Sequence, residues 1–427
     1  MIKIIDIELL KKAYEEFKLN KTMYNKMYEY YKGNTDAIKN YKMVTERSNN
    51  KISVNYIKKL INEEVSYSVG NDVTYISKSG SENIVNDIDY YLDHWSEGHD
   101  SNLTKNMLIY SLAYELYYVD REGQFSSKVI NPENGYAVID DFGNIQYFLH
   151  MFKLKFKDEI YIDVYDNNSI YHFDEEFKQI NKPTQHIFGH VPIGICRLSE
   201  EGRDNTIYKD IKGLQDAYET NLSDISNEIS DFRNAYLVLT GVQIDKNDIP
   251  EMKKLGVLQA KDKNSKIEWL IKNINDTFIQ NTLNTIEDKI YQITSHINHN
   301  EKMQSNTSSL ALRSRLISLE EKCKLNQKAI ADCIKTRLKF LFIYLRVLKN
   351  MDYDFRDIKI KFTPNIPQDD LMVSQIVSQL GDRISVETAL AQLSFIENPK
   401  NELEKLKAEN EENDIGKNLL EEADLDE

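Results

Sequence analysis

The sequence predicts an α+β fold in which long helices accompany a stretch of short antiparallel strands, and three patterns support this prediction. Apolar residues recur at helical spacing over much of the 427 residues. Between Tyr117 and Phe173, short β-type runs alternate with turn signals rich in Gly, Asn and Asp. From Leu310 to Asn350 neither proline nor glycine interrupts the apolar spacing. This run predicts one helix of about 40 residues, roughly 60 Å long.

The N-terminal part is predicted to be helical before the strands begin. Over residues 1–70, Leu10, Tyr14 and Phe17 fall on one helical face, and the run Tyr30 to Asn34 indicates a break. Two more helical stretches are predicted over 84–119, ending in an aromatic run at 110–118. The strands that follow are expected to form an antiparallel meander, at 128–130, 136–139, 145–156, 161–165 and 170–173.

Beyond Pro192 the chain is predicted to be helical again, with helices at 214–232 and 279–297 that flank a β-like interval. A polar interval at 296–309 then leads into the long helix, and 358–362 is predicted as a strand. Residues 368–397 indicate a small helical unit with a turn at Gly381. After Pro399 the sequence is charge-rich and mostly acidic, which predicts a solvated tail; docking of this tail onto a partner is the alternative.

Charge and composition exclude several classes of protein. A net charge of −15 argues against a broad surface that grips nucleic acid, because tight phosphate binding needs clustered Lys and Arg. Three cysteines without a CxxC pair indicate free thiols in a reducing compartment. The N-terminus lacks the pattern of a secretory signal. No apolar run reaches the roughly 20 residues that span a bilayer. We therefore expect a soluble, intracellular protein without membrane contact.

The sequence contains no motif that predicts catalysis or a cofactor. The phosphate loop, the GxGxxG fingerprint, the GxSxG elbow and the HExxH helix are all missing from it. Two groups that include histidine resemble metal ligands, but neither predicts a metal site. We interpret the first as an exposed turn, because it contains Gly98: His94, Glu97, His99 and Asp100. We interpret the second as solvated loop residues, because it has no further ligand nearby: His296, His299 and Glu301. The chain is accordingly predicted not to be an enzyme, and to hold no metal or cofactor.

Five acidic residues of the helix at 214–232 lie mostly opposite its apolar stripe. They are Asp216, Glu219, Asp224, Glu228 and Asp231. One interpretation is an ordinary solvated face. The other is a strip that lines a passage for DNA or meets basic residues of a neighbouring subunit. Such a strip acts only within about 8 Å at physiological salt.

Several short motifs, in a fixed order, resemble those of one known family. They include Tyr30-Tyr31-Lys32-Gly33, the helix from Asn55 that ends at Tyr67-Ser68-Val69-Gly70-Asn71, Phe188-Gly189-His190-Val191-Pro192-Ile193, Leu214 to Asp231 followed by Leu237 to Gly241, Asn306 to Leu312, and Phe362 to Pro367. Over residues 30–400 the chain resembles the portal (head-to-tail connector) proteins of tailed bacteriophages, of the siphophage type from phages of Gram-positive hosts. The usual proline after Asn71 and the usual glycine at Ser309 are replaced, which leaves the shape of both turns open.

The resemblance implies an elongated portal subunit with wing, helical stem, clip, long wing helix and helical crown. Its implied parts are 1–205 wing, 206–235 stem helix, 236–272 clip, 273–297 second stem helix, 298–309 tunnel loop, 310–349 long wing helix, 350–365 wing strand, 366–410 crown and 411–427 acidic flexible tail. Twelve such subunits would form a ring at the capsid vertex of the virion. Double-stranded DNA would be packaged and ejected through the channel of this ring, which would be assembled in the host cytoplasm.

The resemblance also implies where partners and DNA would bind. The tunnel loop would face DNA with His299, Glu301, Lys302, Gln304, Asn306 and Ser308. Lys302 could bind the DNA phosphates weakly. The clip would contact the terminase large subunit and then the head-tail adaptor through Asp245, Lys246, Asp248, Lys253 and Lys254. Scaffold and major capsid protein are the remaining implied partners.

Two other functions compete with this interpretation. A helical scaffold or adaptor without a role on DNA would also explain the long helices and the acidic tail. A DNA-packaging nuclease-ATPase is the third possibility, but its motor chemistry needs backbone amides around phosphates, and the phosphate loop that supplies them is missing.

Overall fold

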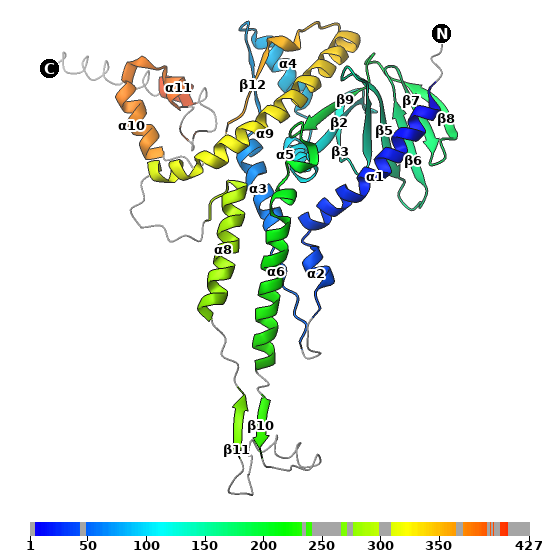
Figure 1. Cartoon of the computed structure of the whole chain (residues 1–427). Helices are drawn as coiled ribbons and strands as arrows, with labels where there is room; N and C mark the ends of the chain where they lie inside the picture. Colours follow the sequence, from blue (N-terminus) through cyan, green and yellow to red (C-terminus); the bar gives the residue numbers. More distant parts are fainter. Residues whose placement is uncertain are drawn as a thin grey trace, which may run out of the picture. The chain divides into compact units, whose positions relative to one another are not determined.

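The structure is a computed structural model that describes residues 5–42, 48–232, 236–240, 266–270, 276–298, 309–363, 370–390, 393, 396 and 402–408. The chain divides into two compact units: residues 1–304 with 314–364, and residues 305–313 with 365–427. Helices and strands occur together, as predicted, and Figure 1 shows their order along the chain.

The N-terminal helices confirm the predicted helical start. They are α1 (Ile7–Tyr31), α2 (Asp36–Asn40), α3 (Tyr56–Val69), α4 (Glu82–Leu92) and α5 (His99–Tyr110). Polar caps fix where they begin, because the first turn of a helix has unpaired N–H groups. Asp6 accepts a hydrogen bond from Leu9 N at 3.0 Å, and Asn55 accepts one from Lys58 N at 3.0 Å. The predicted break is confirmed at the end of α1, where Gly33 takes a φ of +86°.

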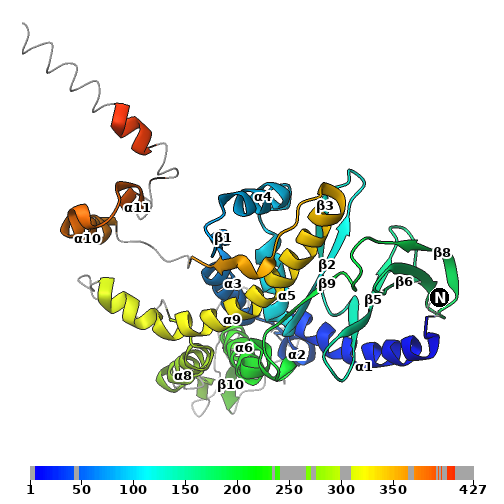
Figure 2. The same ribbon diagram turned by 90° about the horizontal axis from the view of Figure 1, so that it is seen from above.

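The predicted meander is confirmed for four of its five strands, and a strand that was not predicted completes the sheet. The predicted strand at 128–130 belongs instead to a second sheet, described below. In order β4-β5-β6-β7-β8, the strands of the meander are β4 (Gly135–Ile139), β5 (Ile145–Lys153), β6 (Ile160–Tyr165), β7 (Ser169–Asp174) and β8 (Gln179–Gln185). Helix α1 covers one face of this sheet (Figure 2), where Tyr14 and Phe17 pack on Leu149, Ile162 and their neighbours. The opposite face packs in part on a second sheet through Phe148.

The second sheet corrects one prediction. Its order is β3-β2-β9, with β2 (Leu112–Val119), β3 (Phe125–Ile130) and β9 (Ile193–Arg197). The aromatic run at 110–118, predicted as the end of a helix, is mostly the central strand β2. Five consecutive residues of β2, Ala113 to Tyr117, are buried. A strand buried on both faces has no alternating pattern, so its periodicity does not distinguish it from a helix.

The long helix is confirmed as α9 (Ser309–Tyr344), followed by a π-helical turn over Leu345–Lys349. Its 36 residues correspond to about 54 Å. Asn350 ends it in the left-handed region, with φ 58°. The predicted strand near 358–362 is β12 (Ile358–Lys361), which pairs with β1 (Thr74–Ser77).

The remaining elements also follow the predicted order. They are α6 (Ile207–Phe232), the ribbon of β10 (Tyr236–Thr240) and β11 (Lys266–Leu270), and α8 (Asp276–Thr294). In the second unit, α10 (Asp370–Leu380) and α11 (Val386–Leu390) flank a turn that begins at Gly381, as predicted. The predicted tail at 411–427 lies outside the described residues.

Candidate functional site

Helices α6 and α8 form a pair, and an aromatic contact joins this pair to α3 (Figure 1). Tyr56 of α3 is buried, and its ring lies 5.3 Å from that of Tyr218 on α6 and 6.0 Å from that of Tyr291 on α8, edge-on to both. Edge-to-face aromatic pairs stabilise a contact beyond the area they bury. One side chain thus holds three helices together, including both helices predicted to be stem helices.

The polar face of α6 is occupied by the chain's own N-terminal segment. Gln215, Glu219, Ser223 and Asn227 recur every four residues, so they share one face, and each is at most 1% exposed. We call these four residues the polar ladder. None of the three non-acidic members was singled out from the sequence. Their four-residue spacing is visible in the sequence, but polar residues on one face of a helix ordinarily indicate that this face is exposed to solvent.

The polar ladder hydrogen-bonds the backbone of an extended segment, residues 48–54. Glu219 accepts from Val54 N at 2.9 Å, and Gln215 donates to Val54 O. Ser223 accepts from Ile52 N at 3.0 Å. Asn227 accepts from Asn50 N at 2.6 Å and donates to Asn50 O at 2.9 Å. The segment therefore runs antiparallel to α6, and helix side chains act toward it as a neighbouring strand would.

The buried Glu219 corrects the expectation of an exposed acidic face. Its carboxylate also accepts from Ser53 Oγ at 3.1 Å, from Gln215 Nε2 at 2.8 Å and from the Thr35 hydroxyl. Because its side chain is 0% exposed, it can face neither solvent nor a channel. Multiple donors of this kind are what make a buried carboxylate tolerable.

Two of the other predicted acidic residues of α6 accept hydrogen bonds within the subunit. Asp216 accepts from the Tyr30 hydroxyl at 2.9 Å and from Lys212 Nζ at 2.8 Å. Asp224 accepts from the Tyr41 hydroxyl at 2.5 Å; burial and then this carboxylate raise the pKa of Tyr41. Asp231 lies near the end of α6, like Glu228. A channel-facing or subunit-interface role for these residues stays a prediction.

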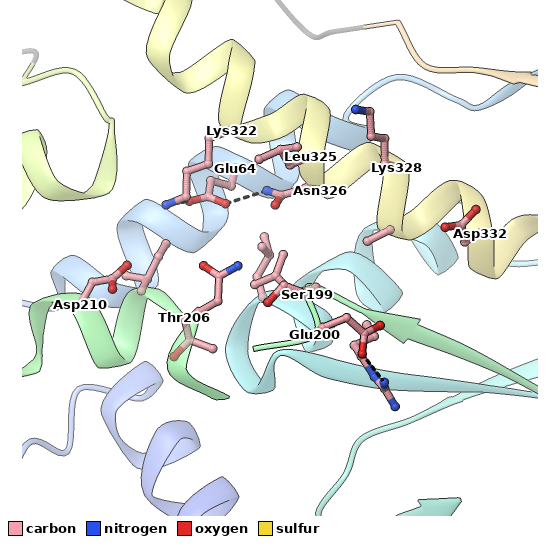
Figure 3. Close-up of a pocket in the computed structure, with 16 residues that line it drawn as sticks. Glu64, Ser199, Glu200, Thr206, Asp210, Lys322, Leu325, Asn326, Lys328 and Asp332 are labelled. Carbon is pink, nitrogen blue, oxygen red and sulfur yellow. Dashed lines mark hydrogen bonds and ion pairs between the residues drawn. The ribbon is translucent and has the colours of Figure 1, made fainter. Parts of the chain in front are cut away.

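A second cluster joins α3, the end of α8 and α9 at a cavity of about 380 Å³ (Figure 3). Glu64 is fully buried; it pairs with Lys322 Nζ at 2.7 Å and accepts from Asn326 Nδ2 at 2.7 Å. We call Glu64, Lys322, Asn326 and His296 the helix-junction cluster. The cavity carries charges of both signs, including Asp210 of α6, and burial raises the pKa of Asp210 although Lys322 opposes this.

His296 attaches the end of the α8 segment to this cluster. Its ring nitrogens lie 2.8 Å from Thr294 O and 3.1 Å from Leu60 O, and Lys322 Nζ donates to Thr294 O at 3.1 Å. Burial lowers the pKa of His296 although the Glu64 carboxylate opposes this shift. His296 lies in the loop after α8, as expected, but the expectation that it is solvated is wrong, because the residue is buried.

The helix-junction cluster holds the chain both before and after the predicted tunnel loop. His296 precedes the loop, and Lys322 follows it on α9. The loop residues themselves lie outside the described residues: His299, Glu301, Lys302, Gln304, Asn306 and Ser308. So do the predicted clip residues Asp245, Lys246, Asp248, Lys253 and Lys254.

We expect Lys322→Met to weaken this anchor. Glu64 would remain fully buried without its cation, which costs about 3 kcal/mol. Hydrogen exchange of the full chain should then become faster at the end of α8, around Thr294 and His296. Lys324→Met is the matched control, because its side chain is 59% exposed and its amine pairs with Glu320 on the same helix. Equal exchange in both variants would show that the ion pair does not hold this end.

Within the described ranges, no group of three or more His, Cys, Asp or Glu side chains could hold a metal ion. In the metal-like group at 94–100, two residues form ion pairs or hydrogen bonds with other parts of the chain: His99 lies 2.8 Å from Glu115, and Asp100 pairs with Arg337. The three cysteines are free and buried, in line with the predicted free thiols. None of the described helices combines the length and apolar character needed to cross a bilayer.

Comparison with known proteins gives one family and a few relatives. Residues 10–416 match the family model described as "Phage portal protein, SPP1 Gp6-like". The portal protein of Bacillus phage SPP1 is 24% identical over 404 residues, which cover 88% of this chain and 79% of that protein.

Two solved structures with similar chains come from gene transfer agent particles. One is the neck of an empty particle (TM-score 0.47) and the other the virion of a native particle (TM-score 0.46). In each, the matching chain is 10% identical, over 79% of this chain and 88% of that one.

Proposed function

Since the chain belongs to the SPP1 Gp6-like family of phage portal proteins, we propose that twelve copies of it close into a ring at one vertex of a phage capsid. It is a portal protein, and its ring is the opening through which the phage DNA enters the head. A head-to-tail interface that closes on itself leaves a central hole, and here the hole is the functional product. The family match over residues 10–416 carries this conclusion.

The helix pair α6 and α8 supports a stem role for residues 206–235 and 273–297. The two helices stand on either side of the β10–β11 ribbon in the chain, and the ribbon lies within the predicted clip. Tyr56 and the polar ladder fix the pair to the N-terminal part of the subunit. A stem built in this way can keep its position while DNA moves past it.

The acidic composition supports a bore that does not retain DNA. With a net charge of −15 per chain, the ring repels a polyanion wherever its surface approaches one. A few phosphate contacts per subunit, multiplied around a ring, would instead prevent free sliding. The tunnel loop at 298–309 is proposed to supply the weak contacts, with Lys302 as its cation.

The partners follow from the same proposal. The clip at 236–272 would bind the terminase large subunit during packaging and the head-tail adaptor afterwards. Scaffold and major capsid protein would surround the ring during assembly, which takes place in the host cytoplasm. No step in this scheme requires the portal to be an enzyme.

Purification and imaging of the full chain test the ring. We expect negative-stain images with a central hole, and a native mass of twelve times 49.9 kDa. Particles that stay monomeric or dimeric under every assembly condition would favour the helical adaptor. ATP turnover by the pure protein would favour the packaging enzyme.

A further inference from the structure

A polar recess lies beside the face of the meander that is turned away from α1. Along this face, Phe148 and Tyr165 pack on the second sheet, but the next row of paired residues is polar: His150 lies opposite Asp163, and Asp163 opposite His172. The recess, of about 410 Å³, is bounded by this end of β5, by β3 and the turn after it, and by α5. It is far from the helix-junction cluster in sequence and shares no lining residue with its cavity.

His150 lines this recess without a hydrogen-bond partner. Its side chain belongs to a residue that is 8% exposed, and no hydrogen bond joins its ring to any residue in the described part of the chain. By contrast, His172 in the same row lies 2.7 Å from Asp163 and 3.2 Å from Thr184. The ring nitrogens of His150 are not among the fully enclosed polar atoms without a partner, so they are open to a ligand in the recess.

The remaining lining groups favour an anion. Lys128 and Lys153 are its charged residues, and no carboxylate lines it. Its other polar side chains are four amides, of which Asn106, Asn131 and Asn134 already donate within the chain; the fourth is Asn102. Burial, and then the charge of Lys128, lower the pKa of His150 to about 4, so the neutral ring offers one N–H donor. Two cations, amide donors and one imidazole N–H are the groups that bind a carboxylate.

The chain that continues from the lining residue Lys153 favours a protein partner. The hairpin that follows β5 is exposed and carries Leu154 and Phe156, which are 44% and 94% exposed. Phe156 takes a φ of 69°, which is unusual for a residue with a side chain. Lys155 and Lys157 flank it, and Asp158 and Glu159 follow, so residues 154–159 carry no net charge and their exposed tip is mainly apolar. A protein surface offers apolar contacts to such a tip, whereas the phosphate backbone of a DNA duplex offers charge alone.

We propose that this recess binds an acidic segment of a partner protein, with one carboxylate beside His150 between Lys128 and Lys153, and with apolar neighbours against Leu154 and Phe156. The charge of the site is opposite to that of the chain as a whole, which makes it a local attraction on a repelling surface. The inference goes beyond the portal function and does not depend on ring closure, because every lining residue lies in one subunit.

The test measures binding of a fluorescein-labelled oligoglutamate peptide to the full chain by fluorescence anisotropy. We expect Lys128→Gln with Lys153→Gln to weaken binding about tenfold or more, because two charge-assisted contacts are lost. Lys359→Gln with Lys361→Gln removes the same charge from exposed positions of β12, and should leave the affinity unchanged. His150→Leu should weaken peptide binding without lowering Tm, since the imidazole has no hydrogen bond within the chain to lose.

Three results would overturn the proposal. Equal weakening in the β12 control would mean that the peptide responds to overall charge. A lower Tm for His150→Leu with unchanged peptide binding would make His150 a packing residue. Tighter binding of a labelled DNA duplex than of the peptide, with the same dependence on Lys128 and Lys153, would make the recess a nucleic-acid contact. Loss of rings, by contrast, would affect only the portal function.

Discussion

Replacing Arg337 with methionine should destabilise the folded subunit by about 3–5 kcal/mol. Arg337 of α9 is 2% exposed; its Nε lies 2.8 Å from Glu115 of β2, and its Nη2 lies 2.5 Å from Asp100 of α5. Removing the guanidinium leaves the fully buried Glu115 without its cation. Urea unfolding of the full chain, followed by circular dichroism, measures the change.

The matched control is Arg346→Met, a few residues further along the same helical run. Arg346 is 61% exposed and lies 4.0 Å from Asp352, so its loss should cost about 0.5 kcal/mol or less. Adding Glu115→Gln to Arg337→Met should recover part of the stability, because the unpaired buried charge is then gone. A similar midpoint for the Arg337 and Arg346 variants would contradict the assigned role of the buried pair.

The effect of Arg337→Met should also depend on pH. Burial alone would raise the pKa of Glu115, but Arg337, together with His99 and Tyr117, lowers it to about 2. A carboxylate with a lowered pKa stabilises the fold above its unfolded value near 4.5, and this contribution disappears as the pH falls toward 2. The difference between wild type and variant should therefore be largest at neutral pH and shrink through that window.

The second large effect is expected at Glu219. Glu219→Leu leaves Val54 N and the buried Thr35 hydroxyl without their acceptor, and it removes one of the two acceptors of Gln215 Nε2. At about 1 kcal/mol or more for each buried donor that loses its partner, the loss should reach about 3 kcal/mol. Hydrogen exchange should become faster at Asn50, Ile52 and Val54, because the segment separates from α6.

Glu219→Gln is the conservative control, since its amide oxygen can still accept from Val54 N. We expect a smaller loss of about 1 kcal/mol, with slow exchange retained at Val54. Glu321→Leu removes an exposed carboxylate from α9 and should change neither quantity. If Glu219→Leu left exchange at residues 50–54 unchanged, the polar ladder would not be what holds this segment.

The sequence predicted the helices well because their apolar residues follow a local period. The apolar residues of α6, α8 and α9 are spaced at helical intervals, and no proline or glycine interrupts the run after Leu310. Both features are visible in the sequence without knowing which elements pack against these helices. The meander was predicted for the same reason, from β-type runs between turn signals. Strand β8 was missed because its residues are all exposed and include Pro183, so it shows no buried face.

The sites were harder to predict because burial of a polar residue depends on distant parts of the chain. Glu64, Glu115 and Arg337 are charged residues that the sequence alone would place at the surface. Each is buried only because a partner from another element meets it. Likewise, Ser223 and Asn227 are ordinary polar residues until the segment at 48–54 is placed on α6.

The antiparallel course of residues 48–54 along α6 has a mechanical consequence. The hydrogen bonds of Glu219, Ser223 and Asn227 bridge the helix and the segment, and are spaced along the helix axis. A load applied along that axis therefore strains these bonds in parallel, as in shear, and does not open them one after another as a peeling force would. Residues 48–54 should thus resist tension along the axis of α6 better than sideways displacement. Axial tension is the load that moving DNA would impose on α6 in its proposed role as a stem helix.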